Sequence, residues 1–140
     1  MAAFGGLGTL DMLVIAHRVA PSPYGLGLFT LEDLEAGQLV CNSDDRLIRV
    51  LPLAELATYP AAMQAHIRRY AYRGVGPDTL TEALYYNMDD TRFINHADAP
   101  NLVYDRKAET YRAVRAMPAG TELTCDYGDF AQRGDDCFNF

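Results

Sequence analysis

The sequence predicts one mostly-β domain with a short helical insert, and three observations carry this prediction. The chain has 140 residues, of which 49% are hydrophobic and 22% charged, a size and composition typical of a single globular domain. Short apolar runs separated by turn residues recur in both halves of the chain. Between them lies one stretch rich in good helix formers, residues 53–72.

The N-terminal part predicts short strands joined by tight turns. Residues 1–10 are small and glycine-rich, so we expect a flexible tail there and a structured domain over residues 11–130. The dense proline and glycine cluster at residues 21–27 predicts a turn. The strands expected around it are 12–16, 28–30, 38–41 and 47–50.

The predicted helical segment is followed by further strands. Pro60 suits the first turn of the main helix, with a shorter helical turn before it, and Gly74, Gly76 and Pro77 are expected to end it. Residues 105–109 predict a hairpin turn. The later strands are expected at 84–86, 102–104, 111–115 and 122–125.

Charge, apolar runs and cysteine spacing narrow the possible partners, location and metal sites of the protein. The net charge of −7 and a pI near 4.8 disfavour direct nucleic-acid binding and suit a basic protein partner, although acidity also simply keeps a protein soluble. No apolar run reaches the roughly 20 residues that span a membrane, and no signal-peptide pattern opens the chain, so a cytoplasmic location is expected. Cys41, Cys125 and Cys137 have no zinc or disulfide spacing, and we expect free thiols and no metal site.

Three segments carry unusual chemistry: Tyr24-Gly-Leu-Gly27, Arg92-Phe-Ile-Asn-His96 with Asp98-Ala-Pro-Asn101 after it, and Gly120-Thr-Glu-Leu-Thr-Cys-Asp-Tyr127. The glycine segment alone is typical of a β-turn, and it is no dinucleotide fingerprint because no helix follows it. Adjacent Asn95 and His96 need hydrogen-bond partners if buried, and taken alone His96 is compatible with a hydrogen-bonded core histidine or a surface one. Carboxylates such as Glu122 and Asp126 are more often solvated or structural than catalytic.

Taken together, in this order and spacing, the three segments resemble the SET domain, a family of S-adenosylmethionine-dependent protein-lysine methyltransferases. The resemblance covers about residues 13–130 and is closest to the small single-domain SET proteins of bacteria. It implies a β-clip-like fold of small sheets with a C-terminal pseudoknot. In that knot the Asn-His segment and the strand ending at Tyr127 would thread past each other.

The resemblance also implies a set of site residues. Tyr127 would be the catalytic residue, with its hydroxyl directed into a channel for the substrate lysine. The channel itself would be lined by Cys125, Tyr127 and Phe130. The residues implied to bind S-adenosylmethionine are Tyr24, Gly25, Leu26, Gly27, Arg92, Asn95 and His96. The helical segment would shape a wall of the peptide groove.

The sequence departs from the family pattern in three places. Ala97 replaces the usual serine after Asn-His, and Cys125 occupies a position that often carries an aromatic ring. The smaller Cys125 favours the addition of several methyl groups. The flanking cysteine-rich zinc segments of many nuclear relatives are missing, and residues 131–140, with Phe138 and Phe140, either close the lysine channel or pack as ordinary core.

We therefore expect a protein-lysine N-methyltransferase that acts on a basic protein, for example a histone-like or ribosomal protein. One alternative is a non-catalytic SET-like module that binds peptides. Another is a methyltransferase acting on a non-histone protein or a small-molecule amine. The sequence is compatible with a monomer or a homodimer.

Overall fold

The computed structural model describes residues 12–75 and 79–132, and most of its regular structure is short strands. The strands are β1 (Met12–Leu13), β2 (His17–Ser22), β3 (Gly25–Thr30), β4 (Leu39–Asn42), β5 (Ile48–Pro52), β6 (Ala83–Asn87), β7 (Asn95–His96), β8 (Leu102–Asp105), β9 (Thr110–Ala113) and β10 (Thr124–Cys125). The helices are α1 (Leu53–Leu56) and α2 (Ala61–Tyr70), with 3₁₀ turns η1 (Asp45–Leu47), η2 (Asp90–Phe93) and η3 (Tyr127–Asp129). The predicted mostly-β class with one helical insert is confirmed.

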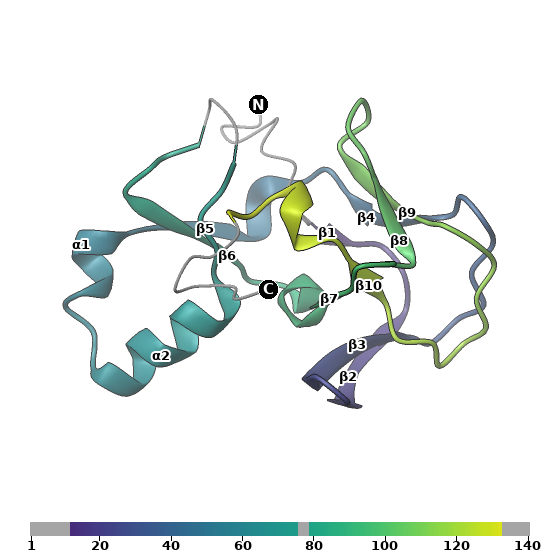
Figure 1. Cartoon of the computed structure of the whole chain (residues 1–140), viewed down its shortest axis with the longest axis horizontal. Helices are drawn as coiled ribbons and strands as arrows, with labels where there is room; N and C mark the ends of the chain where they lie inside the picture. Colours follow the sequence, from purple (N-terminus) through teal and green to yellow (C-terminus); the bar gives the residue numbers. More distant parts are fainter. Residues whose placement is uncertain (1–11, 76–78, 133–140) are drawn as a thin grey trace.

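The strands form several small sheets. An antiparallel sheet has the order β1-β4-β9-β8, the pairs β2–β3 and β5–β6 are antiparallel, and β7 pairs with β10 in parallel. Figure 1 shows α1, α2 and the β5–β6 pair on one side of the molecule and β4, β8 and β9 on the other. The β7–β10 pair lies between these two parts (Figure 1).

The parallel pair brings together two of the segments that the sequence singled out. Asn95 lies opposite Thr124 and His96 opposite Cys125, and the Ala97 amide donates to the Cys125 carbonyl at 3.0 Å. The β8–β9 hairpin occupies the sequence between the two strands. The strand leading to Tyr127 therefore lies beside the Asn-His segment, as the expected pseudoknot requires.

The side chain of a buried asparagine stabilises this strand pair through hydrogen bonds. The Asn101 side chain donates from Nδ2 to the Glu122 carbonyl at 2.8 Å and accepts at Oδ1 from the Thr124 amide, also at 2.8 Å. Its own backbone amide donates to the Thr124 hydroxyl at 3.2 Å. Since Asn101 is only 6% exposed, water cannot easily replace these bonds. The loop after β7 is thus held against β10.

The core has two parts. The larger one includes a group of aromatic rings in which Tyr72 stacks on Tyr85 (centroids 5.8 Å apart) and meets Phe130 edge to face (4.8 Å). The smaller one anchors the helical insert through Leu51, Leu56, Ile67, Ala71 and Leu84. Ile67 is the buried residue of α2, so most of this helix faces away from the core.

Three predicted boundaries are wrong. Residues 21–27 do not form one turn, because β2 and β3 pair as far as Ser22 with Gly25 and leave only Pro23 and Tyr24 to connect them. The helix ends at Tyr70, before the glycines, because Tyr72 pairs with Tyr85 and is buried in the core. The first strand is limited to Met12 and Leu13.

The expectations for Pro60, for the 105–109 turn and for two of the cysteines are met, and others fall outside the described residues. Pro60 caps α2, and the 105–109 segment is a hairpin turn in which Glu109 has a φ of 56°. Cys41 and Cys125 are buried, and neither forms a disulfide. The predicted tail and most of the C-terminal segment, including Phe138 and Phe140, lie outside the described ranges. Within those ranges no helix could span a membrane, and no group of three metal-ligating side chains occurs.

The role of Asn101 gives a stability prediction. Asn101→Ala should lower the free energy of unfolding by about 2–4 kcal/mol, because it leaves the Glu122 carbonyl and the Thr124 amide without partners. Urea titration followed by circular dichroism measures this. Asn42→Ala, at the exposed end of β4, is the matched control and should cost less than about 0.5 kcal/mol. A decrease in the free energy of unfolding below 1 kcal/mol for Asn101→Ala would contradict this role of Asn101.

Candidate active site

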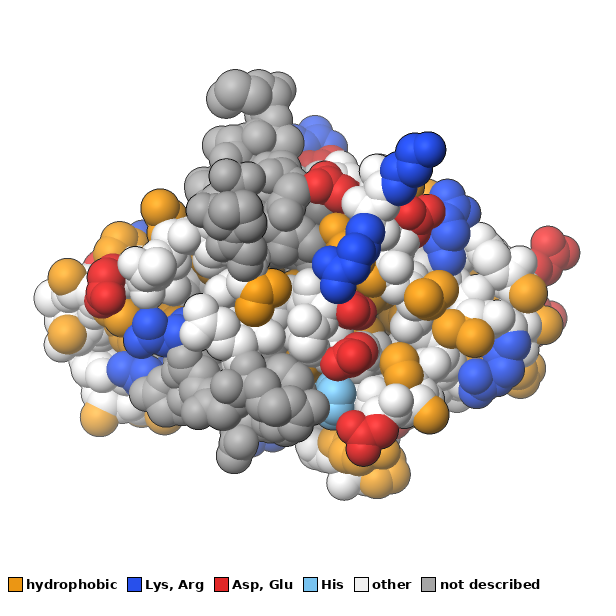
Figure 2. All heavy atoms as spheres, turned by 45° about the horizontal axis from the view of Figure 1, so that its top comes forward, with side chains coloured by type: hydrophobic (Ala, Val, Ile, Leu, Met, Phe, Trp, Pro, Cys, Tyr) orange, Lys and Arg blue, Asp and Glu red, His pale blue; other side chains and the backbone are white. Residues whose placement is uncertain are grey.

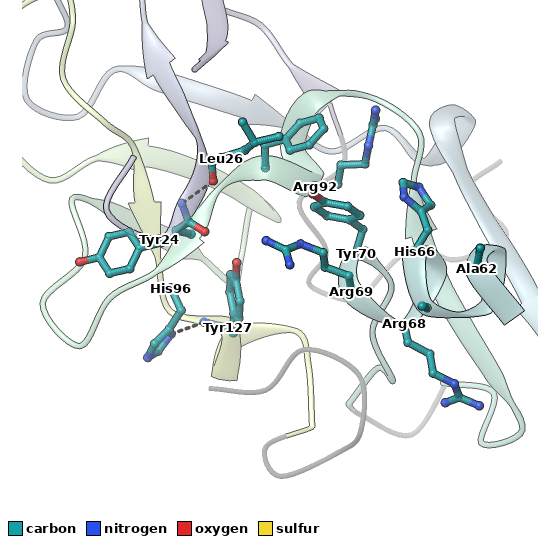
Figure 3. Close-up of a pocket in the computed structure, with 13 residues that line it drawn as sticks. Tyr24, Leu26, Ala62, His66, Arg68, Arg69, Tyr70, Arg92, His96 and Tyr127 are labelled. Carbon is teal, nitrogen blue, oxygen red and sulfur yellow. Dashed lines mark hydrogen bonds between the residues drawn. The ribbon is translucent and has the colours of Figure 1, made fainter. Parts of the chain in front are cut away.

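A pocket of about 990 Å³ opens where α2 faces the β2–β3 connection and the ends of β7 and β10 (Figure 3). Several sequence-predicted site residues meet there, although they come from distant parts of the chain. The lining residues are Tyr24, Leu26, Ala62, Ala65, His66, Arg68, Arg69, Tyr70, Arg92, Phe93, Asn95, His96 and Tyr127. Of the predicted cofactor residues, Gly25 and Gly27 are not part of this lining.

The two glycines act through the backbone. Gly25 has a φ of 107°, a left-handed conformation that glycine adopts without strain, and it turns the chain from the connection into β3. Gly27 is buried, and a Cβ on it would lie 2.5 Å from Oε2 of Glu122. Gly27 therefore lets β3 pack directly on the Glu122 carboxylate. The exposed Tyr24 and Leu26 flank Gly25 at the pocket edge.

Asn95 is oriented by two acceptors. Its Nδ2 donates to the Leu26 carbonyl at 2.9 Å and to Glu122 Oε2 at 2.9 Å. Because both partners can only accept, the amide nitrogen must point toward them and Oδ1 away. Within the described residues Oδ1 has no hydrogen-bond partner, so Asn95 presents a free acceptor at the pocket.

His96 fixes the backbone at the start of η3. Its Nδ1 accepts a hydrogen bond from the Tyr127 amide at 3.1 Å, so in the neutral ring the proton sits on Nε2. Nε2 lies 3.2 Å from Oδ1 of the exposed Asp98 and can donate to it. The main function of this ring in the structure is thus to hold Tyr127 in place.

Tyr127 stands in the pocket wall with its hydroxyl tied to the backbone. The hydroxyl donates to the Ile94 carbonyl at 2.6 Å, and the ring lies 5.4 Å from His96 and 5.7 Å from Phe130. Burial raises the pKa of the Tyr127 phenol above its ordinary value of 10.0, and the Cys125 thiol raises it further. The phenol therefore stays neutral at physiological pH. Since Tyr127 lines the pocket, it is not enclosed in the core.

With this geometry in place, comparison with known proteins assigns the family. A model of the SET domain matches residues 25–128. The chain belongs to the SET domain family. None of the curated proteins matches it.

Solved structures share the fold of this SET domain. One is ctPRC2 in an autoinhibited conformation bound to S-adenosylmethionine, with 20% identity over 82% of this chain and 15% of that chain, and a TM-score of 0.55. Another is a humanized mutant of the Chaetomium thermophilum Polycomb Repressive Complex 2 bound to the inhibitor GSK126, with 22% identity, the same coverages and a TM-score of 0.52. The chain thus spans about 15% of the length of these neighbours.

Three predicted site residues of the SET domain lie less directly at the pocket. Arg92 is in the lining, but its Nη1 donates to the Met88 and Asp89 carbonyls at 3.1 and 2.8 Å, which holds the η2 turn together. Cys125 and Phe130 are fully buried behind Tyr127 and do not line the pocket. Their part in a lysine channel stays a prediction.

Two groups of functional residues were missed by the sequence analysis. Glu122 orients Asn95; its signal was the alternation in which Leu123 and Cys125 face the core, so that Glu122 faces the other way. The helix α2 contributes His66, Arg68, Arg69 and Tyr70 to the pocket, whereas the sequence motifs predict no individual site residue in this helix. A cluster of arginines at one helix end in an acidic chain was the available signal.

The pocket has a charge opposite to that of the whole protein. The chain carries −7, yet three arginines and two histidines line the pocket and no aspartate or glutamate does. Glu122 does not line the pocket and already accepts a hydrogen bond from Asn95. This lining suits a ligand with at least one anionic group.

Proposed function

We propose that this SET domain is a protein-lysine N-methyltransferase that uses S-adenosylmethionine. The observation that carries the proposal is the meeting of Asn95, His96 and Tyr127 at one pocket, each oriented by its own hydrogen bonds. Family membership supports it, and so does the likeness in fold to ctPRC2, whose structure was solved with S-adenosylmethionine bound.

The pocket fits such a cofactor. Its volume of about 990 Å³ is at the upper end of the usual range for ligand sites, which leaves room for a nucleoside and an amino acid side by side. The free Oδ1 of Asn95 suits the ammonium group of the amino acid. S-adenosylmethionine supplies, when bound, a methyl group that is already activated by a positive sulfonium. The protein therefore needs no metal for this reaction.

The main barrier left to the protein is the charge on the substrate lysine. A lysine with a pKa of about 10.4 is about 3.4 units from neutrality at pH 7, a cost of roughly 4.6 kcal/mol. Burial beside the rings of Tyr127 and Phe93, with Arg69 and Arg92 nearby, disfavours the ammonium form and lowers that pKa. The neutral amine would form the N–CH₃ bond as the bond between the methyl group and sulfur breaks; the electron pair would stay on the departing thioether, and the amine would release one proton.

Tyr127 positions the amine and does not remove its proton. The phenol hydrogen is engaged by the Ile94 carbonyl at 2.6 Å, so toward the incoming amine the hydroxyl oxygen can act as an acceptor for an N–H. Because the pKa of Tyr127 is raised, no phenolate is available as a base. The proton can leave through water in the open part of the pocket. Correct orientation of a reacting pair contributes several kcal/mol.

We also propose that the substrate is a basic protein, such as a histone-like or ribosomal protein, and that the protein acts in the cytoplasm. Asp98 and Asp126 lie 3.2 and 3.8 Å from the His96 ring, and Figure 2 shows acidic side chains beside a histidine on one face of the molecule. Such a surface attracts lysine-rich segments. One similar structure, ctPRC2, was solved in complex with H3K27me3 and H3K27M.

Methyl transfer tests the proposal. The wild type, incubated with methyl-labelled S-adenosylmethionine and a panel of histones, ribosomal proteins and cell lysate, should label lysine in discrete bands. Tyr127→Phe should reduce the rate at least about 100-fold, because the oxygen that orients the amine is lost. Tyr104→Phe, on the distant β8 strand, is the matched control and should keep full activity.

Equal labelling by the wild type and Tyr127→Phe would show that Tyr127 is not the catalytic residue. Absence of labelling together with absence of cofactor binding would replace the enzyme by the non-catalytic peptide-binding module.

The pH dependence of kcat/KM separates two roles of Tyr127, as a neutral positioning group or as a phenolate base. With a neutral phenol as positioning group, kcat/KM should rise about tenfold per pH unit below the pKa of the substrate amine, since only the neutral amine reacts. It should show no fall from Tyr127 ionisation up to pH 10, because burial raises the pKa of that phenol above 10.0. Steady-state rates between pH 6.5 and 10, with circular dichroism to confirm folding, measure this. A rise governed by an ionisation that disappears in Tyr127→Phe would instead make the phenolate a base.

A further inference from the structure

Arg69 of α2 reaches across the pocket. Figure 3 shows its guanidinium extending from the helix toward Tyr127 and the β2–β3 connection, whereas the neighbouring Arg68 points away. The Arg69 Nη2 lies 3.1 Å from where a Cβ on Gly25 would stand. Glycine at this position therefore leaves room for the guanidinium beside the loop, as well as allowing the left-handed φ.

Among the residues that the structure describes, this guanidinium has no anionic partner. Across residues 12–75 and 79–132, no hydrogen bond or ion pair engages Arg69, and its recorded contact is with the Tyr70 ring, 5.7 Å from the guanidinium carbon. Other arginines of the chain do find acceptors: Arg46 pairs with Asp44 and Arg49 with Glu55. An arginine that faces a ligand pocket without a carboxylate is available to bind an anion from the ligand.

The loop beside Arg69 indicates which part of the ligand comes close. Leu26 O holds the amide of Asn95, whose free Oδ1 suits an ammonium group, and Gly25 lies next to Leu26 in the chain. An α-amino acid carries an ammonium and a carboxylate on one carbon. When Asn95 binds the ammonium group, the carboxylate of the same amino acid therefore lies within a few ångströms of that ammonium group.

We infer that Arg69 binds the α-carboxylate of the methionine part of S-adenosylmethionine, an inference that rests on the proposed function. The planar guanidinium can donate two parallel N–H bonds to the two carboxylate oxygens, a geometry that a lysine ammonium cannot reproduce. Asn95 on the β7 strand then binds the ammonium group of the amino acid, and Arg69 on α2 binds its carboxylate. The helical insert thereby becomes part of the cofactor site.

Calorimetry with two ligands tests this without reference to turnover. S-adenosylmethionine carries the carboxylate, and its decarboxylated form lacks that group alone. Arg69→Gln should weaken binding of S-adenosylmethionine about 10- to 100-fold, as expected for loss of a charge-assisted hydrogen-bonded pair, and change binding of the decarboxylated form less than about twofold. Arg69→Lys should restore only part of the affinity. Arg115→Gln, an exposed arginine after β9, is the charge-matched control and should bind both ligands like the wild type.

The other outcomes overturn the inference. Equal affinity of Arg69→Gln and wild type for S-adenosylmethionine would show that the guanidinium does not bind the cofactor. Equal weakening of both ligands would show that Arg69 contributes general charge or structure and does not recognise the carboxylate. Failure of the wild type to bind S-adenosylmethionine would instead refute the proposed function, and that result is visible before any variant is measured.

Discussion

The site depends on the parallel pairing of β7 with β10. Each strand contributes only two residues, Asn95 and His96 against Thr124 and Cys125, whereas a typical strand has about five or six. So short a pair contributes little stability by itself. The buried Asn101 supplies additional stability, because its hydrogen bonds join the chain after β7 to Glu122 and Thr124. Without this pairing, the asparagine and the tyrosine of the site would have no fixed relation.

On this pairing depend the positions of Asn95 and Tyr127, which are both oriented by hydrogen bonds within the protein and both present an acceptor to a ligand. Asn95 donates both amide hydrogens inward, to Leu26 and Glu122, and its oxygen remains free. Tyr127 donates its hydroxyl hydrogen to the Ile94 carbonyl, which directs the acceptor side of its oxygen away from Ile94. Fixing these groups before the ligand arrives avoids the cost of reorganising them during the reaction. The same burial that orients Tyr127 raises its pKa and prevents it from acting as a base.

The sequence was sufficient for the fold class and for the central residues, because ordered motifs specify which segments meet. The sequence was insufficient where contacts between distant segments determine which side chains meet. Nothing local to Glu122 reveals that Gly27 packs on its carboxylate, and nothing in the 53–72 segment reveals that Arg69 reaches the glycine loop. The helix end was misplaced because tertiary burial of Tyr72 outweighs helix propensity there. The prolines and glycines of residues 21–27 indicated a turn, but antiparallel pairing extends both strands into that region.

The central claim is that one pocket separates cofactor binding, at Asn95, from positioning of the amine, at Tyr127. Isothermal calorimetry of S-adenosylmethionine with Asn95→Ala and Tyr127→Phe tests it most directly, once circular dichroism has shown that both variants fold. The account predicts that Asn95→Ala loses at least about tenfold in affinity, because the free acceptor is removed, while Tyr127→Phe binds within about twofold of the wild type. Unchanged affinity in Asn95→Ala, or an equal loss in both variants, would contradict it.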